Sequence, residues 1–186
     1  MMVQRIIRIL IPALLLIFQY YGSYGQRFIA RNGYVRFYSE APLENIEAVN
    51  NDGQSILDIS TERIAFTIPI NDFKFEKKLM QQHFNENYLE SDKYPTSTFT
   101  GRISGISHAS GKQELTAEGE LTIHGQTREI SVKGHGTITD EKIMLEASFP
   151  VELVDFNIKI PKVVFYNIAE VVEVTIKFEY SPYEPN

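Results

Sequence analysis

The sequence predicts an all-β fold, an antiparallel eight-stranded barrel with one or two short helices. Apolar and polar residues alternate with period two over long stretches, very short turns join three of these stretches, and the strands total about eight. At that number a sheet can close on itself and remove its exposed edges. A two-sheet sandwich is the competing architecture, but long strands in simple sequence order favour the barrel.

The clearest strands form a meander. Residues 113–123 alternate strictly between apolar and polar, and the alternation resumes over 129–138 after a short turn at His124-Gly125. A third strand at 143–149 follows an equally tight turn at residues 140–141. Turns this short join only antiparallel neighbours, so a parallel α/β sheet is excluded here.

Shorter alternating stretches predict the remaining strands. In chain order they are Val35–Phe37, Ile46–Ala48, Leu57–Ile59 after a turn at residues 51–53, Ile64–Ile70, Phe99–Ile103 and Val172–Tyr180. Two segments break the alternation. Apolar residues of 75–88 recur at near-helical spacing before Pro95, which predicts one or two short helices across the barrel or its mouth. Residues 156–168 are too apolar for an ordinary exposed connection, so we expect them to fold over or into the opening.

Residues 1–25 have the pattern of a secretory signal peptide. Two arginines precede an unbroken apolar run at 9–18, and the small residues Ser23 and Gly25 stand three and one positions before the predicted cleavage point. The run is shorter than the ~20 residues that a membrane-spanning helix needs. We therefore expect one domain over 26–186, with no membrane span in the mature form and a periplasmic or secreted location. An uncleaved amphiphilic anchor is the alternative.

Composition excludes several classes of function. The chain holds no cysteine, which excludes a disulfide framework, a cysteine nucleophile and a lipid-anchoring cysteine. The region 26–186 holds 16 basic and 24 acidic residues, a formal charge of −8. Nucleic-acid binding depends on clustered Lys and Arg that neutralise phosphates, so we expect no nucleic-acid partner.

The sequence also gives little support for catalysis. Its four histidines are scattered without metal-ligand spacing, and His124 is interpreted as a turn residue. Glu114, Glu118 and Glu120 lie on the solvent face of a predicted strand, and there is no Gly-x-Ser-x-Gly motif. We expect no enzymatic activity, no metal site and no cofactor.

Small inward residues on the central strands bear on what fills the barrel. An eight-stranded barrel can be packed by its own side chains or can hold one small ligand. The predicted inward face includes Ala117, Gly119, Gly134, Gly136 and Ala147, which leave room for a ligand. The alternative is that the glycines only allow the sheet to curve while large residues fill the interior.

Three stretches resemble the YceI family of periplasmic lipid- and polyisoprenoid-binding proteins. They are Leu79–Tyr88 with the following Lys93-Tyr94-Pro95, then Phe99, and the hairpin Gly119–Gly125. The family pattern is a helical segment ending in Tyr-Pro, a Phe in the next strand, and a Gly-x-Leu-Thr-Ile-x-Gly hairpin. The similarity covers most of 27–180 and implies a lipocalin-like barrel with an elongated apolar cavity and no catalytic centre.

Two positions depart from the family pattern. The family commonly carries an Arg-Asp pair before the helical segment, where this chain has Phe75-Glu76-Lys77-Lys78. A Gly commonly follows an Asp-Phe pair late in the chain, where this chain has Asn157. Asparagine tolerates the left-handed backbone conformation, so we expect it to supply the same turn.

The expected partner is a long-chain isoprenoid, such as a polyisoprenoid or isoprenoid quinone, or another apolar lipid. Each methylene is worth ~0.8 kcal/mol against water, but the lipid normally lies in a membrane, so exchange into the barrel should be reversible. The alternative is an exported structural or protein-interaction module with a side-chain-filled barrel, and residues 156–168 could also join two copies in a homodimer. The residues that we predict to line the cavity are Phe37, Phe66, Phe84, Phe99, Leu121, Val132, Phe149 and Phe165.

Overall fold

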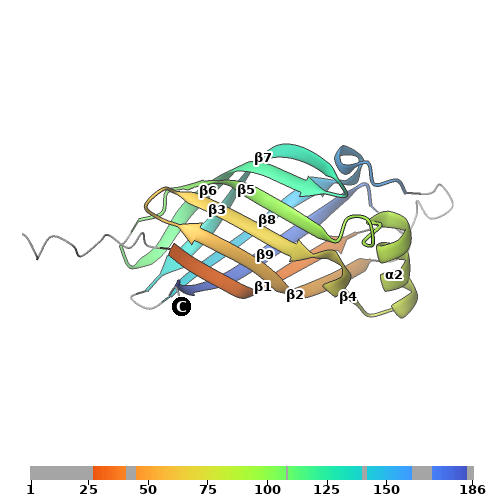
Figure 1. Ribbon diagram of the computed structural model, residues 1–186, viewed down its shortest axis with the longest axis horizontal. Helices are drawn as coiled ribbons and strands as arrows, with labels where there is room; N and C mark the ends of the chain where they lie inside the picture. The colour runs from red at the N-terminus through yellow and green to blue at the C-terminus, as the bar shows by residue number, and fades with distance from the viewer. Residues whose placement is uncertain (1–26, 41–44, 108, 140–141, 161–168, 184–186) are drawn as a thin grey trace, which may run out of the picture.

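The computed structural model describes residues 27–40, 45–107, 109–139, 142–160 and 169–183. Within these ranges the strands form one antiparallel sheet (Figure 1). Their bounds are β1 Arg27–Ser39, β2 Ile46–Asp58, β3 Arg63–Pro69, β4 Lys74–Phe75, β5 Thr96–Ser104, β6 Gly111–Ile123, β7 Gln126–Ile138, β8 Ile143–Glu152 and β9 Val171–Pro182.

The sheet closes into the predicted eight-stranded barrel. Its order is β1-β9-β8-β7-β6-β5-β3-β2, and β2 pairs back with β1, while the two-residue β4 pairs with β2 outside the ring. Strands that follow one another in the chain are neighbours around the ring, and every ladder is antiparallel. The sandwich alternative is therefore wrong.

The predicted turn at residues 51–53 is also wrong, because β2 continues through it. The Asn50 side chain accepts a hydrogen bond from the Asp52 backbone N–H at 2.7 Å and donates one to the Pro69 carbonyl at 2.7 Å. Gly53 pairs with Gly33 of β1 across a shift in register. The turn-like residues thus form an irregularity within one long strand, and the two short predicted strands on either side are one strand.

Short helices lie at one end of the barrel (Figure 1). They include α2, Lys78–His83, and the π-helical turn η3, Phe84–Tyr88, so the helical prediction is confirmed for 78–88, whereas Phe75 lies in β4. The 3₁₀ turns η2, Ile70–Asp72, and η4, Leu153–Phe156, lie between strands. Within the described ranges, no helix combines the length and the apolar character that a membrane crossing needs.

We call the end with α2, η3, η4 and the β6–β7 turn the helix end, and the opposite end the terminal end. At the terminal end the Tyr183 backbone N–H bonds the Arg27 carbonyl at 2.8 Å, which places both described chain ends together (Figure 1). The β6–β7 hairpin turns in two residues, with φ of 50° at His124 and 70° at Gly125. These are the backbone angles of a type I′ hairpin, so the predicted turn is confirmed.

Two other expected turns have different outcomes. Asn157 has φ of 55°, so it does supply the left-handed turn after η4. The predicted turn at residues 140–141 lies outside the described residues.

The apolar segment 156–168 is described in part. The structure describes residues 156–160, where Phe156 and Ile158 are buried, and residues 161–168 lie outside the described ranges.

Candidate ligand-binding cavity

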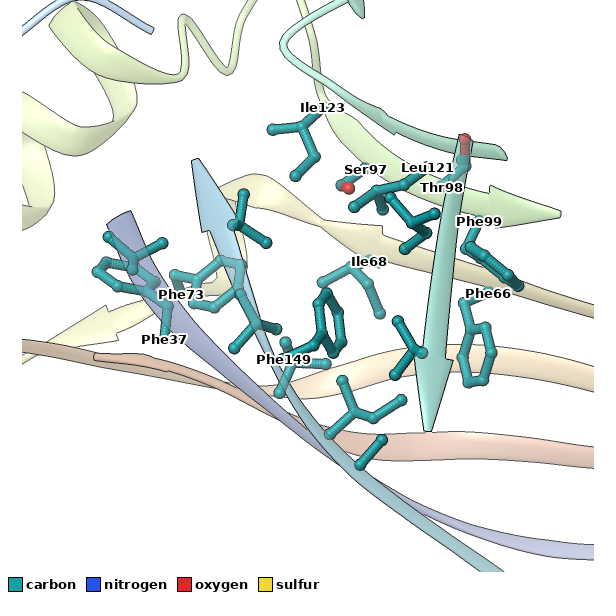
Figure 2. Close-up of a pocket in the computed structure, with 18 of the residues that line it drawn as sticks. Phe37, Phe66, Ile68, Phe73, Ser97, Thr98, Phe99, Leu121, Ile123 and Phe149 are labelled. Atoms are coloured by element: carbon teal, nitrogen blue, oxygen red, sulfur yellow. The ribbon is translucent and has the colours of Figure 1, made fainter. Parts of the chain in front are cut away.

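The barrel encloses a cavity of about 330 Å³. A volume of ~300 to 1,000 Å³ is typical of pockets that enclose small ligands. Side chains from all eight barrel strands line it, together with residues of α2, η3 and η4, and most of them are apolar. Figure 2 shows Ile68, Leu121 and Phe149 approaching the same space from three different strands. The interior is therefore only partly filled by the protein's own side chains.

Three aromatic rings lie together in the cavity toward the terminal end. Phe66 lies edge-on to Phe178 at 4.8 Å between ring centroids and 6.0 Å from Phe99. The Phe178 ring fits because Gly33 has no side chain, since a Cβ there would lie 2.0 Å from the ring. We call Phe66, Phe99 and Phe178 the floor of the cavity. Ile64 and Ile103, further toward the terminal end on β3 and β5, also line the cavity, whereas Tyr180, which follows Phe178 on β9, is fully buried and does not.

A second aromatic cluster covers the helix end. Phe37 stacks on Phe84 of η3 at 5.4 Å and lies 5.6 Å from both Phe73 and Phe75. Phe84 also contacts Phe73 at 5.5 Å and Phe75 at 5.0 Å. We call these four residues the roof. Each ring contacts others of the group, so the roof is a packed unit and not a set of independent side chains.

His124 has a larger role than the turn residue that the sequence predicted. Its side chain is buried, with Nδ1 3.1 Å from the Phe156 carbonyl oxygen and Nε2 2.6 Å from Oε2 of Glu90, and its ring lies edge-on to Tyr94 at 4.7 Å. It joins the β6–β7 turn to η4 and to the loop after η3. Only long-range contacts reveal this role, although Tyr94 belongs to the Tyr-Pro motif and His124 to the hairpin motif of the sequence.

The contact with His124 also changes the pKa of Glu90. The hydrogen bond from His124 lowers the pKa of Glu90, with a smaller contribution from Lys93. The contact therefore favours the ionised form of the Glu90 carboxyl at the helix end of the barrel.

The cavity brings the predicted lining residues together. Seven of the eight predicted positions line it, from β1, β3, η3, β5, β6, β7 and β8, and the eighth, Phe165, lies outside the described residues. That these side chains contact a ligand stays a prediction. The sequence reasoning missed Phe73, Phe75 and Phe178, although the alternation of β9 points Phe178 inward. The seven that line the cavity are Phe37, Phe66, Phe84, Phe99, Leu121, Val132 and Phe149.

The small inward residues divide into two groups. Ala117, Gly134 and Ala147 line the cavity, as the ligand hypothesis requires. Gly119 and Gly136 are not among the lining residues. A Cβ at Gly119 would lie 2.3 Å from the Thr100 carbonyl oxygen, and one at Gly136 would lie 2.7 Å from a Leu115 methyl carbon. These two glycines therefore do not enlarge the cavity, and they let strands and side chains approach closely.

Comparison with known proteins decides the family. A family model described as a YceI-like domain matches residues 33–180, most of the chain. The chain belongs to the YceI-like family. The resemblance seen in the helical segment, the Tyr-Pro pair and the β6–β7 hairpin is therefore confirmed, as is the lipocalin-like barrel that it implied.

Solved structures share the fold of this YceI-like chain at low sequence identity. A polyisoprenoid binding domain from Saccharophagus degradans, implicated in plant cell wall breakdown, aligns with a TM-score of 0.72 at 12% identity over 85% of this chain and 99% of that domain. BcnA of Burkholderia cenocepacia gives 0.63 at 18%, over 81% and 96%. The YCEI protein of Campylobacter jejuni gives 0.64 at 18%, over 78% and 90%. A comparison with curated proteins found no match.

Proposed function

We propose that this YceI-like protein binds a long apolar lipid, a polyisoprenoid or an isoprenoid quinone, and sequesters or carries it outside the cytoplasm. The apolar cavity of about 330 Å³ between an aromatic floor and an aromatic roof is the observation that carries the proposal. A structural neighbour named as a polyisoprenoid binding domain has the same fold, which supports a ligand of this class.

The lining chemistry suits reversible binding without a reaction. Leu, Ile, Val and Phe side chains offer apolar contact along the cavity, and polar groups such as Ser97 and Thr98 are few. A lipid chain is surrounded by apolar groups both in the bilayer and in this cavity. The free energy of its transfer from one to the other should therefore be small. Small transfer energies allow loading and release, which a carrier needs.

The proposed location depends on residues 1–25. Two arginines, an apolar run and small residues before the expected cleavage point support export and a mature domain over 26–186. N-terminal sequencing of protein from its native host tests this directly, with a first residue of Gln26 expected. A mature chain that still begins at Met1 in the cytoplasmic fraction contradicts it.

The ligand is tested by extracting protein purified from the native host with organic solvent and analysing the extract by mass spectrometry. A complementary binding assay uses the absence of tryptophan in the chain. Phe99→Trp places a unique fluorophore in the floor of the cavity, and Ile56→Trp, at a position 54% exposed on the outside of β2, is the matched control. We expect a long-chain isoprenoid quinone to quench the fluorescence of the Phe99→Trp variant and to leave that of the Ile56→Trp variant unquenched.

Two outcomes contradict the proposal: an extract without lipid together with equal quenching of the two reporters, or no quenching of either. Size-exclusion chromatography with and without the quinone distinguishes the interaction-module alternative. A protein that forms a homodimer and takes up no lipid would support that alternative instead.

A further inference from the structure

The wall of the barrel is open between β7 and β8 in its helix half. The β7–β8 ladder runs only from Gly134↔Ala147 to Ile138↔Ile143. Beyond it, residues 126–133 of β7 pair with β6 and residues 148–152 of β8 pair with β9, and in this described part no pairing joins the two strands to each other. We call this stretch the β7–β8 gap.

The sequence explains why the gap does not close. Pro150 lies in the separated part of β8, and proline has no backbone N–H to donate to a neighbouring strand. On the facing side, β7 carries the charged residues Arg128, Glu129 and Lys133, which are exposed. Proline and charged side chains are the usual protection of strand edges. The two edges are thus built to remain unpaired.

The cavity reaches the gap. Val132 of β7 and Phe149 of β8 line it from the separated parts of their strands. His135 and Glu146 line it as well, although both side chains are exposed on the outer face. These two residues are register partners in the first pairs after the strands join. Residues on both sides of the gap, and at the point where the strands join, therefore border the cavity.

Among the described residues, side chains obstruct the cavity at both ends of the barrel. At the terminal end a ligand meets the floor and then fully buried Tyr180. At the helix end it meets the roof, whose four phenylalanine rings contact one another beneath α2 and η3. Passage through the gap breaks no backbone hydrogen bond between β7 and β8, and the cavity-lining side chains there, such as Val132 and Phe149, are partly exposed.

We propose that an apolar chain passes between the cavity and a lipid bilayer through the β7–β8 gap, an inference that rests on the proposed lipid-binding function. The bilayer is the partner because η4 presents an apolar contact beside the gap. η4 directly follows β8 and packs against β7. Its Leu153 lines the cavity, while its Val154 is 74% exposed. An apolar side chain next to an apolar opening suits contact with a lipid surface.

η4 is held in this position from two sides. The Leu153 backbone N–H donates to the Glu170 carbonyl at 2.9 Å, and the His124 ring contacts the Phe156 carbonyl at 3.1 Å. These contacts keep Leu153 toward the cavity and Val154 toward solvent. The edge of the gap is therefore a defined surface with an apolar residue on the outside.

Cross-linking across the gap tests the route. The chain has no cysteine, so Lys133→Cys with Ser148→Cys introduces the only two thiols, at exposed positions just beyond the last strand pair. A short bifunctional methanethiosulfonate reagent joins them reversibly. Thr137→Cys with Met144→Cys is the matched control, because these residues are register partners where the strands are already paired. Both pairs carry Phe99→Trp as the reporter.

The measurement is the rate at which this reporter is quenched after mixing with phosphatidylcholine vesicles that contain an isoprenoid quinone. We expect the 133–148 cross-link to slow quenching by about tenfold or more, as closing a gate does, and reduction to restore the rate. The 137–144 cross-link should leave the rate unchanged. Equal rates before and after reduction of the 133–148 cross-link overturn the route while leaving lipid binding intact. If the reporter is never quenched in any form, the proposed function itself fails.

The contact with the bilayer has its own test. Val154→Asp alters a side chain that is mostly in solvent, so the fold should be retained, and Ile56→Asp makes the same change at the distant terminal end. We expect Val154→Asp to slow quinone uptake from vesicles by about threefold to tenfold, since it replaces an apolar contact with a charge that apolar surroundings disfavour. Ile56→Asp should have no effect. Equal slowing by both substitutions, or by neither, contradicts the proposed contact.

Discussion

The same alternating strands run through the terminal half and the helix half of the barrel, but their inward side chains are buried to different extents. In the terminal half, inward residues such as Leu57, Ile143 and Tyr180 are at most 2% exposed. In the helix half, inward residues such as Val132 and Phe149 are only partly buried and border a cavity. Alternation of apolar and polar residues therefore determines which side chains face inward, and it leaves open whether they fill the inside.

The halves also differ in how completely the strands pair. At the terminal end the ladder between β7 and β8 is continuous, and Tyr180 donates a hydrogen bond to Ser55 across the interior. In the helix half the same two strands separate. The packed half provides stability, and the open half provides room, so substitutions in the two should affect different measurements.

The largest expected effect is loss of packing in the terminal half. Leu57→Ala should lower the free energy of unfolding by about 2 to 5 kcal/mol, because Leu57 is fully buried among neighbours that relax only partly. Ile130→Ala, on the partly exposed wall of the cavity, should cost only about 1 kcal/mol, since its side chain is half-buried already. Urea denaturation measures both. Equal losses would contradict the distinction between a packed and an open half.

Enlarging a small residue sharpens the same comparison from the other direction. Ala30→Leu adds carbon atoms where Ala30 is 2% exposed, beside buried Ser55, and overpacking there should lower the free energy of unfolding by about 1 to 3 kcal/mol. Ala117→Leu projects into existing space and should leave stability unchanged while weakening quinone binding. Denaturation and quenching of the Phe99→Trp reporter measure the two effects. A large stability loss in Ala117→Leu would show that the cavity is smaller than described.

A smaller effect is expected from the buried hydroxyl of Tyr180. Ser55 donates its proton to the Ala65 carbonyl at 2.8 Å, so the Tyr180 hydroxyl donates to Ser55 at 2.6 Å. Tyr180→Phe removes this hydrogen bond and should lower the free energy of unfolding by about 1 kcal/mol. Quinone uptake should not change, because Tyr180 lies beyond the floor. If Tyr180→Phe changed quinone uptake and left the free energy of unfolding unchanged, the terminal half would be the binding region, which contradicts the comparison.

The smallest expected effect concerns Glu90 at the helix end. His124 lowers the pKa of Glu90, and a carboxylate with a lowered pKa adds stability above its ordinary pKa and loses it as the pH falls through the lowered value. The difference in unfolding free energy between the native chain and Glu90→Gln should therefore shrink as the pH falls below about 4. Chemical denaturation at a series of pH values measures it, with Glu114→Gln on the outer face of β6 as the control. A difference that is constant with pH would contradict the pair.

Much of the fold could be predicted because its signals are local. Period-two alternation identified the strands, and the His124-Gly125 pair identified a two-residue hairpin that the backbone angles confirm. The prediction of a turn at residues 51–53 was wrong because the same residues can form either a turn or an irregular strand. The Asn-Asp-Gly stretch in β2 is typical of a turn in isolation, yet pairing with β1 and the contact from Asn50 to Pro69 keep it within a strand.

The candidate site was less predictable. Large inward residues at known strand positions were identified correctly as neighbours in space, because inward direction follows from the alternation. The roof was only partly found, because Phe73 follows the short turn η2 and Phe75 lies in the two-residue strand β4, and neither element is long enough to show a period. The contact between His124 and Glu90 joins residues that are 34 positions apart, and no spacing rule connects them.

The amino-acid order alone was sufficient for the barrel class and the hairpin turn, since each depends on the backbone preferences of adjacent residues. The assembled barrel was needed to establish that the barrel holds a cavity, that Leu57, Ile143 and Tyr180 are packed at the terminal end and that β7 and β8 separate in the helix half. This is because an internal volume is the difference between the space enclosed by eight strands and the sum of the side chains within it. No single stretch of sequence contains that difference.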